Sequence, residues 1–128
     1  MIMRLRFHVV ILIALCFLVG CSEHHGVPPA DRHAYQGIRD SADWRNPIVS
    51  VYADGIEVKG VAGRVSPEKL TDVLKQLPTN AWPYGRVVIV GEVGIRSGSD
   101  DILIKKNTVI ILKSLKDAGI EVELWPSA

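Results

Sequence analysis

From Asn46 onward the chain alternates between short β-rich runs and amphipathic helical patterns, and this order constrains the fold more than any other feature. Two β-rich runs, residues 48–53 and 56–59, lie on either side of Asp54-Gly55. Asp-Gly in this position favours a hairpin with a type I′ turn, which requires positive φ at both central residues. The folded part is therefore predicted to begin with two antiparallel strands.

Two helices and two further strands are expected after the hairpin. Ser66 is a typical N-cap and Pro67 suits the first helical position. Apolar residues then recur at helical spacing, at Leu70, Val73, Leu74 and Leu77. Residues 86–91 (RVVIVG) form a short apolar run after Arg86, as in a strand buried on both faces. A second helix of about seventeen residues follows, with Gly119 as its C-cap, and 120–125 is the last strand.

This order predicts an α+β fold with two layers. The β–α–β connections favour parallel neighbouring strands joined by right-handed crossovers. Both helices should then cover the same face of a small mixed sheet with the element order ββαβαβ. We expect residues 46–128 to form one globular α/β domain with a single core.

The first twenty residues have the pattern of a bacterial secretory signal. Arg4 and Arg6 precede an uncharged apolar run, residues 9–19. Such a run is shorter than the roughly twenty residues that a spanning helix needs, so a short membrane anchor is the weaker interpretation. The run ends in Leu18-Val19-Gly20-Cys21, which resembles the lipobox of bacterial lipoproteins.

The lipobox resemblance implies that residues 1–20 are a signal peptide and that Cys21 carries acyl chains such as palmitate. Two or more acyl chains anchor a protein stably to a membrane. Ser22 stands where an aspartate would be the usual inner-membrane retention signal, so the outer membrane is favoured, with the domain facing the periplasm. Cys16 lies in the leader and Cys21 is acylated in this prediction, so no free thiol remains to form a disulfide.

Residues 21–45 are predicted to be a flexible tether between the membrane and the domain. They are polar, contain Pro28-Pro29 and show neither strand nor helix periodicity. Trp44, near the end of this segment, is expected to dock onto the folded part.

The charge balance argues against a nucleic-acid partner. Without residues 1–20 the chain has thirteen lysines and arginines against fourteen aspartates and glutamates, with both signs interspersed. Such a surface exerts no long-range attraction on nucleic acid or anionic lipid. The predicted contact with the membrane is therefore the lipid on Cys21.

The predicted domain contains neither histidine nor cysteine. A Ser-His-Asp or Cys-His catalytic arrangement and a His or Cys zinc site are therefore not expected within it. His24-His25 beside an acylated cysteine would make a poor metal site. Glycines 91, 94 and 98 match no phosphate-loop spacing. We predict no metal, no cofactor and no enzymatic activity.

Three carboxylates are candidates for a ligand site. Glu92 ends the buried strand, near the place where open α/β sheets bind ligands. Asp100 and Asp101 lie at the start of the second helix, where acidic residues favour the helix N-terminus. Solvated ion pairs and helix capping explain these residues without any ligand. The alternative is a small enzyme or ligand-binding domain that acts on cell-wall material through them.

Trp82, Tyr84 and Trp125 are candidate partner-binding residues. Tryptophan and tyrosine dominate the energetics of many protein interfaces. Aromatic residues also close the ends of small cores, so a place in the core is the competing interpretation.

The domain resembles the periplasmic domain of the ExbD/TolR biopolymer-transport family. The similarity rests on the hairpin around Asp54-Gly55, the pair Leu70 and Leu74, the strand residues 87–89, and the segment 115–120 (LKDAGI). Family members carry a transmembrane helix with a proton-responsive aspartate, whereas this chain has a lipobox, so motor function is not implied. The resemblance implies an envelope domain that meets other proteins, with a homodimer through a sheet edge as one arrangement. The predicted function is thus a membrane-anchored lipoprotein that binds or scaffolds envelope proteins.

Overall fold

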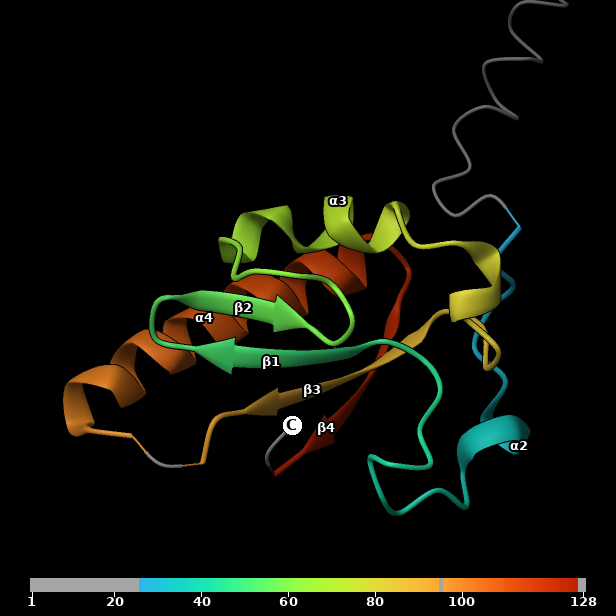
Figure 1. Ribbon diagram of the computed structural model, residues 1–128, viewed down its shortest axis with the longest axis horizontal. Coiled ribbons are helices and arrows are strands. Elements are labelled where there is room, and N and C mark those ends of the chain that lie inside the picture. Colours follow the sequence, from blue (N-terminus) through green and yellow to red (C-terminus); the bar gives the residue numbers. More distant parts are fainter. Residues whose placement is uncertain (1–25, 95, 127–128) are drawn as a thin grey trace, which may run out of the picture.

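The computed structural model describes residues 26–94 and 96–126. Its regular elements, in chain order, are α2 (Arg32–Tyr35), β1 (Ile48–Tyr52), β2 (Gly55–Val58), α3 (Leu70–Lys75), β3 (Val87–Glu92), α4 (Gly98–Asp117) and β4 (Glu121–Trp125). In this part of the chain four strands form one sheet in the order β2-β1-β3-β4 (Figure 1). β1 is antiparallel to β2 and parallel to β3, and β3 is parallel to β4.

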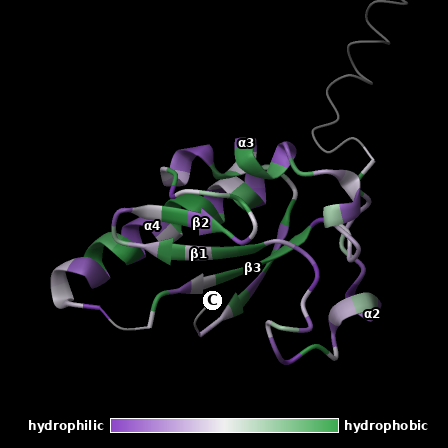
Figure 2. Ribbon diagram, in the orientation of Figure 1, coloured by the Kyte–Doolittle hydropathy of each residue, from purple (hydrophilic) through white to green (hydrophobic). Residues whose placement is uncertain are grey.

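The two longer helices, α3 and α4, cover the same face of this mixed sheet (Figure 1). Their apolar faces pack onto the strands in one core, in which Leu70, Leu74, Ile104, Ile111 and Leu115 are the most deeply buried helix residues. Figure 2 shows the hydrophobic colour concentrated along the central strands and the hydrophilic colour on the connecting turns. The α+β prediction with two helices on one face is confirmed.

The hairpin of β1 and β2 is also confirmed, but its turn differs from the prediction. Tyr52 pairs with Gly55, so Ala53 and Asp54 are the two central residues of the turn. Neither has positive φ, which excludes a type I′ turn. Gly55 has a φ of +150°, and a Cβ on it would lie 2.5 Å from the carbonyl oxygen of Val65. The close approach of the chain at Val65 is therefore what requires glycine here.

The helices begin and end near the predicted residues, but not every predicted capping residue forms a capping hydrogen bond. Pro67 begins a 3-10 turn that leads into α3, yet Ser66 makes no side-chain capping bond. α4 has 20 residues, more than predicted. It begins earlier because the Ser97 hydroxyl accepts a hydrogen bond from the Asp100 amide. Gly119 has a φ of +73°, as expected just after a helix.

Strand β3 is buried on both faces, as its apolar run predicts. Val88 and Val90 belong to the core beneath α3 and α4. Val87 and Ile89 point to the opposite face and belong to a second apolar cluster. Something other than the two helices must therefore cover that face.

The covering element is the segment that precedes β1, so the predicted tether is wrong for the described residues 26–45. Tyr35 and Trp44 are only 4% and 6% exposed. The segment is also hydrogen-bonded to the domain, through the Asp31 amide to the Tyr84 carbonyl (2.8 Å) and the Arg86 amide to the Pro28 carbonyl (2.9 Å). The folded domain thus begins well before Asn46.

Four aromatic residues, Tyr35, Trp44, Tyr84 and Trp125, form what we call the aromatic cluster. The Trp44 ring centroid lies 5.4 Å from that of Tyr35, 5.0 Å from that of Tyr84 and 6.4 Å from that of Trp125. Large aromatic rings remove much apolar area from water, so a few of them hold an irregular segment that has no periodic pattern. This is why the sequence periodicity does not reveal the segment.

The predicted signal peptide, the lipobox with Cys21 and the His24-His25 pair lie outside the described residues. Within residues 26–94 and 96–126, no helix combines the length and apolar character needed to cross a membrane.

Candidate functional site

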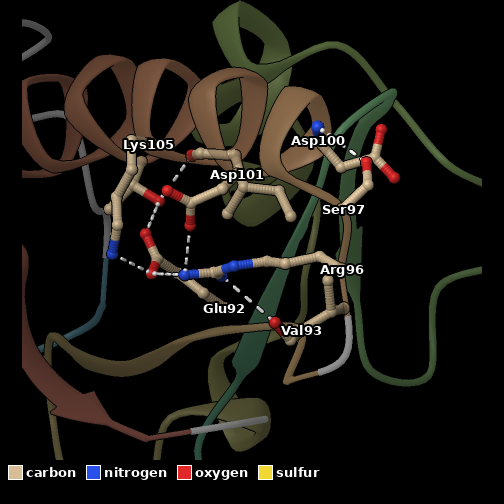
Figure 3. A network of polar contacts seen from close by, with 9 residues as sticks. Glu92, Val93, Arg96, Ser97, Asp100, Asp101 and Lys105 are labelled. Carbon is tan, nitrogen blue, oxygen red and sulfur yellow. Dashed lines mark hydrogen bonds and ion pairs between the residues drawn. The ribbon is translucent and has the colours of Figure 1, made fainter.

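Two of the three predicted carboxylates meet where β3 ends and α4 begins (Figure 3). Arg96, in the connecting loop, joins them. Its Nη2 atom lies 3.3 Å from Oε1 of Glu92 and 2.7 Å from Oδ1 of Asp101. Its Nη1 atom donates to the carbonyl of Val93 over 3.1 Å. Arg96 therefore clamps the loop to the first turn of α4.

Glu92 has two further partners, both on α4. Nζ of Lys105 lies 2.5 Å from Oε1 of Glu92, and the Thr108 hydroxyl donates to Oε2 over 2.7 Å. Lys105 and Thr108 are three residues apart, so they project from the same side of the helix. The Glu92 carboxylate is thus surrounded by a guanidinium, an ammonium and a hydroxyl group.

These partners set the charge state of Glu92. Burial by itself would raise the pKa of this carboxyl group. The hydrogen bonds from Lys105 and Thr108 and the positive charges of Lys105 and Arg96 outweigh burial, so the pKa is lowered. A general acid at neutral pH needs a raised pKa. Glu92 is instead held as an ion-paired carboxylate.

Asp100 takes no part in this network. Figure 3 shows its side chain pointing away from Glu92 and Arg96, while its backbone amide donates to the Ser97 hydroxyl. Its position in the first turn of α4 fits the helix-capping interpretation. Among the described residues, no group of three His, Cys, Asp or Glu side chains is arranged to hold a metal ion.

The pH dependence of stability tests this description of Glu92. Because its folded pKa is lowered, the ionised carboxylate stabilises the domain above about pH 5, and this stabilisation is lost as the pH falls through the folded pKa. Glu92→Gln should therefore lower the free energy of unfolding by about 1 kcal/mol at pH 7. The difference from the wild type should shrink toward pH 3 in urea unfolding curves. The exposed Glu68→Gln variant is the control, and a Glu92→Gln difference that does not change with pH would contradict the assignment.

Two of the three candidate partner-binding residues are buried, which corrects that prediction. Trp82 is 4% exposed and belongs to the core beneath the helices. Tyr84 is 8% exposed, and its hydroxyl donates to the Asp43 carbonyl and accepts from the Arg45 amide. Both residues stabilise the fold because their rings fill interior space. Trp125 remains half-buried at the surface beside Trp44.

An apolar surface, which no sequence pattern predicted, lies along β4. Leu124 is 67% exposed, and Val109 on α4 is 68% exposed. A groove of about 360 Å³ lies between them, lined by Val90, Glu92, Lys105, Thr108, Val109, Leu112, Leu124, Trp125 and Pro126. Side chains alternate between the two faces of a strand, so the sequence predicts that Leu124 points to the opposite face from Glu123 and Trp125. Its exposure could not be predicted, because it depends on β4 being an edge strand.

A second cavity shares the end of β4 and has about 490 Å³. It is lined by Arg32, Tyr35, Gln36, Ile38, Arg39, Trp44, Glu123, Leu124, Trp125 and Pro126. We call it the α2 cavity, and we call the first one the α4 groove. The two share residues 124–126, so the end of β4 lies between them.

Comparison of the chain with protein-family models, with curated proteins and with solved structures finds no match. The similarity to the ExbD/TolR domain therefore stays a prediction from short motifs.

Proposed function

We propose that this protein is a lipid-anchored adaptor of the cell envelope whose small domain binds or scaffolds other envelope proteins. The observation that carries the proposal is the apolar surface at β4. Single exposed apolar residues are ordinary on soluble domains. Here Leu124 and Val109 line one groove next to an edge strand. Apolar side chains gathered in this way are typical of protein-binding surfaces.

The anchor in this proposal is Cys21. The lipobox resemblance supports acylation at this residue, retention at the outer membrane, and a domain that faces the periplasm. An anchored domain meets membrane partners at a high local concentration, so a small interface suffices for specific binding. The geometry at Glu92 gives no support to the carboxylate-enzyme alternative, because its lowered pKa and its three partners suit ion pairing.

Crosslinking in intact cells followed by mass spectrometry tests the adaptor function. The wild-type lipoprotein is expected to capture a specific envelope protein, and the Cys21→Ala variant should lose that capture because the domain is no longer held at the membrane. The abundance of both proteins is checked by immunoblot. Capture of bulk envelope proteins alone by the wild type would contradict the proposal.

A further inference from the structure

The two edges of the sheet differ in how they are protected. The outer side of β2 is covered, because Ile56 and Val65 exchange backbone hydrogen bonds of 2.9 and 3.0 Å. In the described part of the chain, β4 pairs with β3 alone. Unpaired backbone groups on an edge strand are a template for another strand.

The register shows which backbone groups of β4 face away from β3. The Glu121 amide donates to the Arg86 carbonyl over 2.9 Å, so Glu121 turns its backbone groups toward β3. Backbone direction alternates along a strand, so Glu123 and Trp125 do the same. The N–H and C=O groups of Val122 and Leu124 therefore point away from the sheet. They offer two donors and two acceptors to an added strand.

Residues of an added strand would send alternate side chains to the two faces of the sheet. Opposite residues share a face, so the residue opposite Leu124 would enter the α4 groove. Its neighbour, opposite Trp125, would enter the α2 cavity. The two spaces thus lie where consecutive side chains of one added strand would go.

The chemistry of the two spaces differs. The α4 groove presents Val109, Leu112 and Leu124, which favour an apolar side chain. The α2 cavity is lined by two arginines, Arg32 and Arg39, and by one glutamate, Glu123. Within the described residues, neither arginine forms an ion pair. This cavity therefore favours a carboxylate, which can bind a guanidinium through charge-assisted hydrogen bonds.

We propose that β4 binds an extended segment of the partner protein by strand addition, with an apolar residue opposite Leu124 and an acidic residue opposite Trp125. The proposal rests on the adaptor function and names the surface and partner chemistry that serve it. Main-chain hydrogen bonds supply affinity in this mode of recognition, and the pockets for alternate side chains supply specificity.

A second copy of β4 fits this edge less well than a foreign segment. Antiparallel pairing centred on Val122 places Glu121 opposite Glu123, and pairing centred on Glu123 places the two Glu123 residues opposite each other. Like charges in directly opposite positions are destabilising. Pairing centred on Leu124 avoids this, but it aligns only residues 123–125 of the strands.

A peptide-binding measurement tests the proposal directly. The probe is fluorescein-labelled Ser-Glu-Val-Thr-Val-Thr-Ser, whose glutamate would lie opposite Trp125 and whose first valine would lie opposite Leu124. Fluorescence anisotropy with the full-length protein in detergent should show saturable binding. A probe with lysine in place of glutamate should bind about tenfold more weakly, because it meets two guanidinium groups. The proposal would be overturned if the two probes bound equally well, or if neither probe bound.

Variants on the protein side make the test specific. Arg39→Glu should reverse the preference and favour the lysine probe. Lys69→Glu, at an exposed lysine that ends the 3-10 turn Pro67–Lys69, should leave the preference unchanged. Leu124→Lys should abolish binding of the glutamate probe. Both Leu124 and Arg39 are exposed, and thermal unfolding checks that each variant keeps its fold. Self-association of the wild type that Leu124→Lys abolishes would make a second copy the occupant and overturn the proposal.

Site-specific crosslinking in cells separates this proposal from the adaptor function. A photoreactive residue at position 124 should capture the partner, and one at position 69 should not. Capture by the wild-type chain that persists in Leu124→Lys would overturn strand addition but leave the adaptor function standing. If the wild-type chain forms no specific crosslink to any envelope protein, the adaptor function itself is contradicted.

Discussion

The Asn46→Ala variant is expected to lose about 3–5 kcal/mol of unfolding free energy. Asn46 is a buried polar residue, only 5% exposed. Its Nδ2 atom donates to the carbonyls of Gly85 (2.7 Å) and Val87 (2.8 Å), and its Oδ1 atom accepts from the Tyr84 amide (2.8 Å). Alanine would remove the partner of the Val87 carbonyl and of the Tyr84 amide, and the Gly85 carbonyl would keep only its hydrogen bond from the Val87 amide (2.8 Å). Urea unfolding followed by tryptophan fluorescence measures the loss.

Two further variants sharpen the Asn46 experiment. Asn46→Asp has nearly the same shape but places a carboxylate against two carbonyl oxygens, so it should also be strongly destabilising at pH 7. It should recover part of its stability at acidic pH, because a protonated carboxyl group can donate one hydrogen bond. Asn80→Ala, at an exposed asparagine, should change stability by less than about 0.5 kcal/mol. A loss at Asn46→Ala no larger than at Asn80→Ala would contradict this role.

Trp44→Ala is expected to lower the unfolding free energy by about 3–5 kcal/mol. The ring is 6% exposed and contacts Tyr35, Tyr84 and Trp125. Its removal would open a cavity on the face of the sheet that α3 and α4 do not cover. The same unfolding assay measures the change, with the remaining tryptophans as reporters.

Tyr35→Phe is the matched control for Trp44→Ala. It keeps the ring of Tyr35 and removes only the hydroxyl, which donates to Oε2 of Glu121 over 3.4 Å. Burial and the charge of Glu121 raise the pKa of Tyr35, so the hydroxyl is protonated in the wild type. The expected loss is below about 1 kcal/mol. If Trp44→Ala were as mild as this control, the segment before β1 would behave as the tether that its composition predicts.

The order of the elements could be read from the sequence because each depends on local signals. Pro67 marks the beginning of the first amphipathic helix, and Gly119 follows the end of the second. The apolar run at β3 correctly predicted burial on both faces, yet it did not reveal what covers the second face. Trp44 was expected to dock, but nothing local indicated that Tyr35 would dock with it.

The candidate site likewise combines residues that the sequence placed correctly with contacts that only the tertiary structure shows. Glu92 was placed correctly at the end of β3, and Asp101 at the start of α4. Their bridging by Arg96, and the choice between Asp100 and Asp101, depend on the direction of each side chain around the first turn of the helix. The partners of Glu92 on α4 lie 13 and 16 residues away in sequence. No local pattern encodes such pairings.

By itself, the sequence determined the α+β class, the hairpin and the two helices on one face, because periodicity, turn residues and caps act over a few neighbouring positions. Tertiary structure alone decided which two residues are central in the turn before Gly55. It also decided the burial of Trp82 and Tyr84 and the folding of residues 26–45 onto the sheet. It also left β4 as the open edge between two cavities. These features arise where segments distant in sequence approach closely, and close packing there decides which side chains are enclosed and which face solvent.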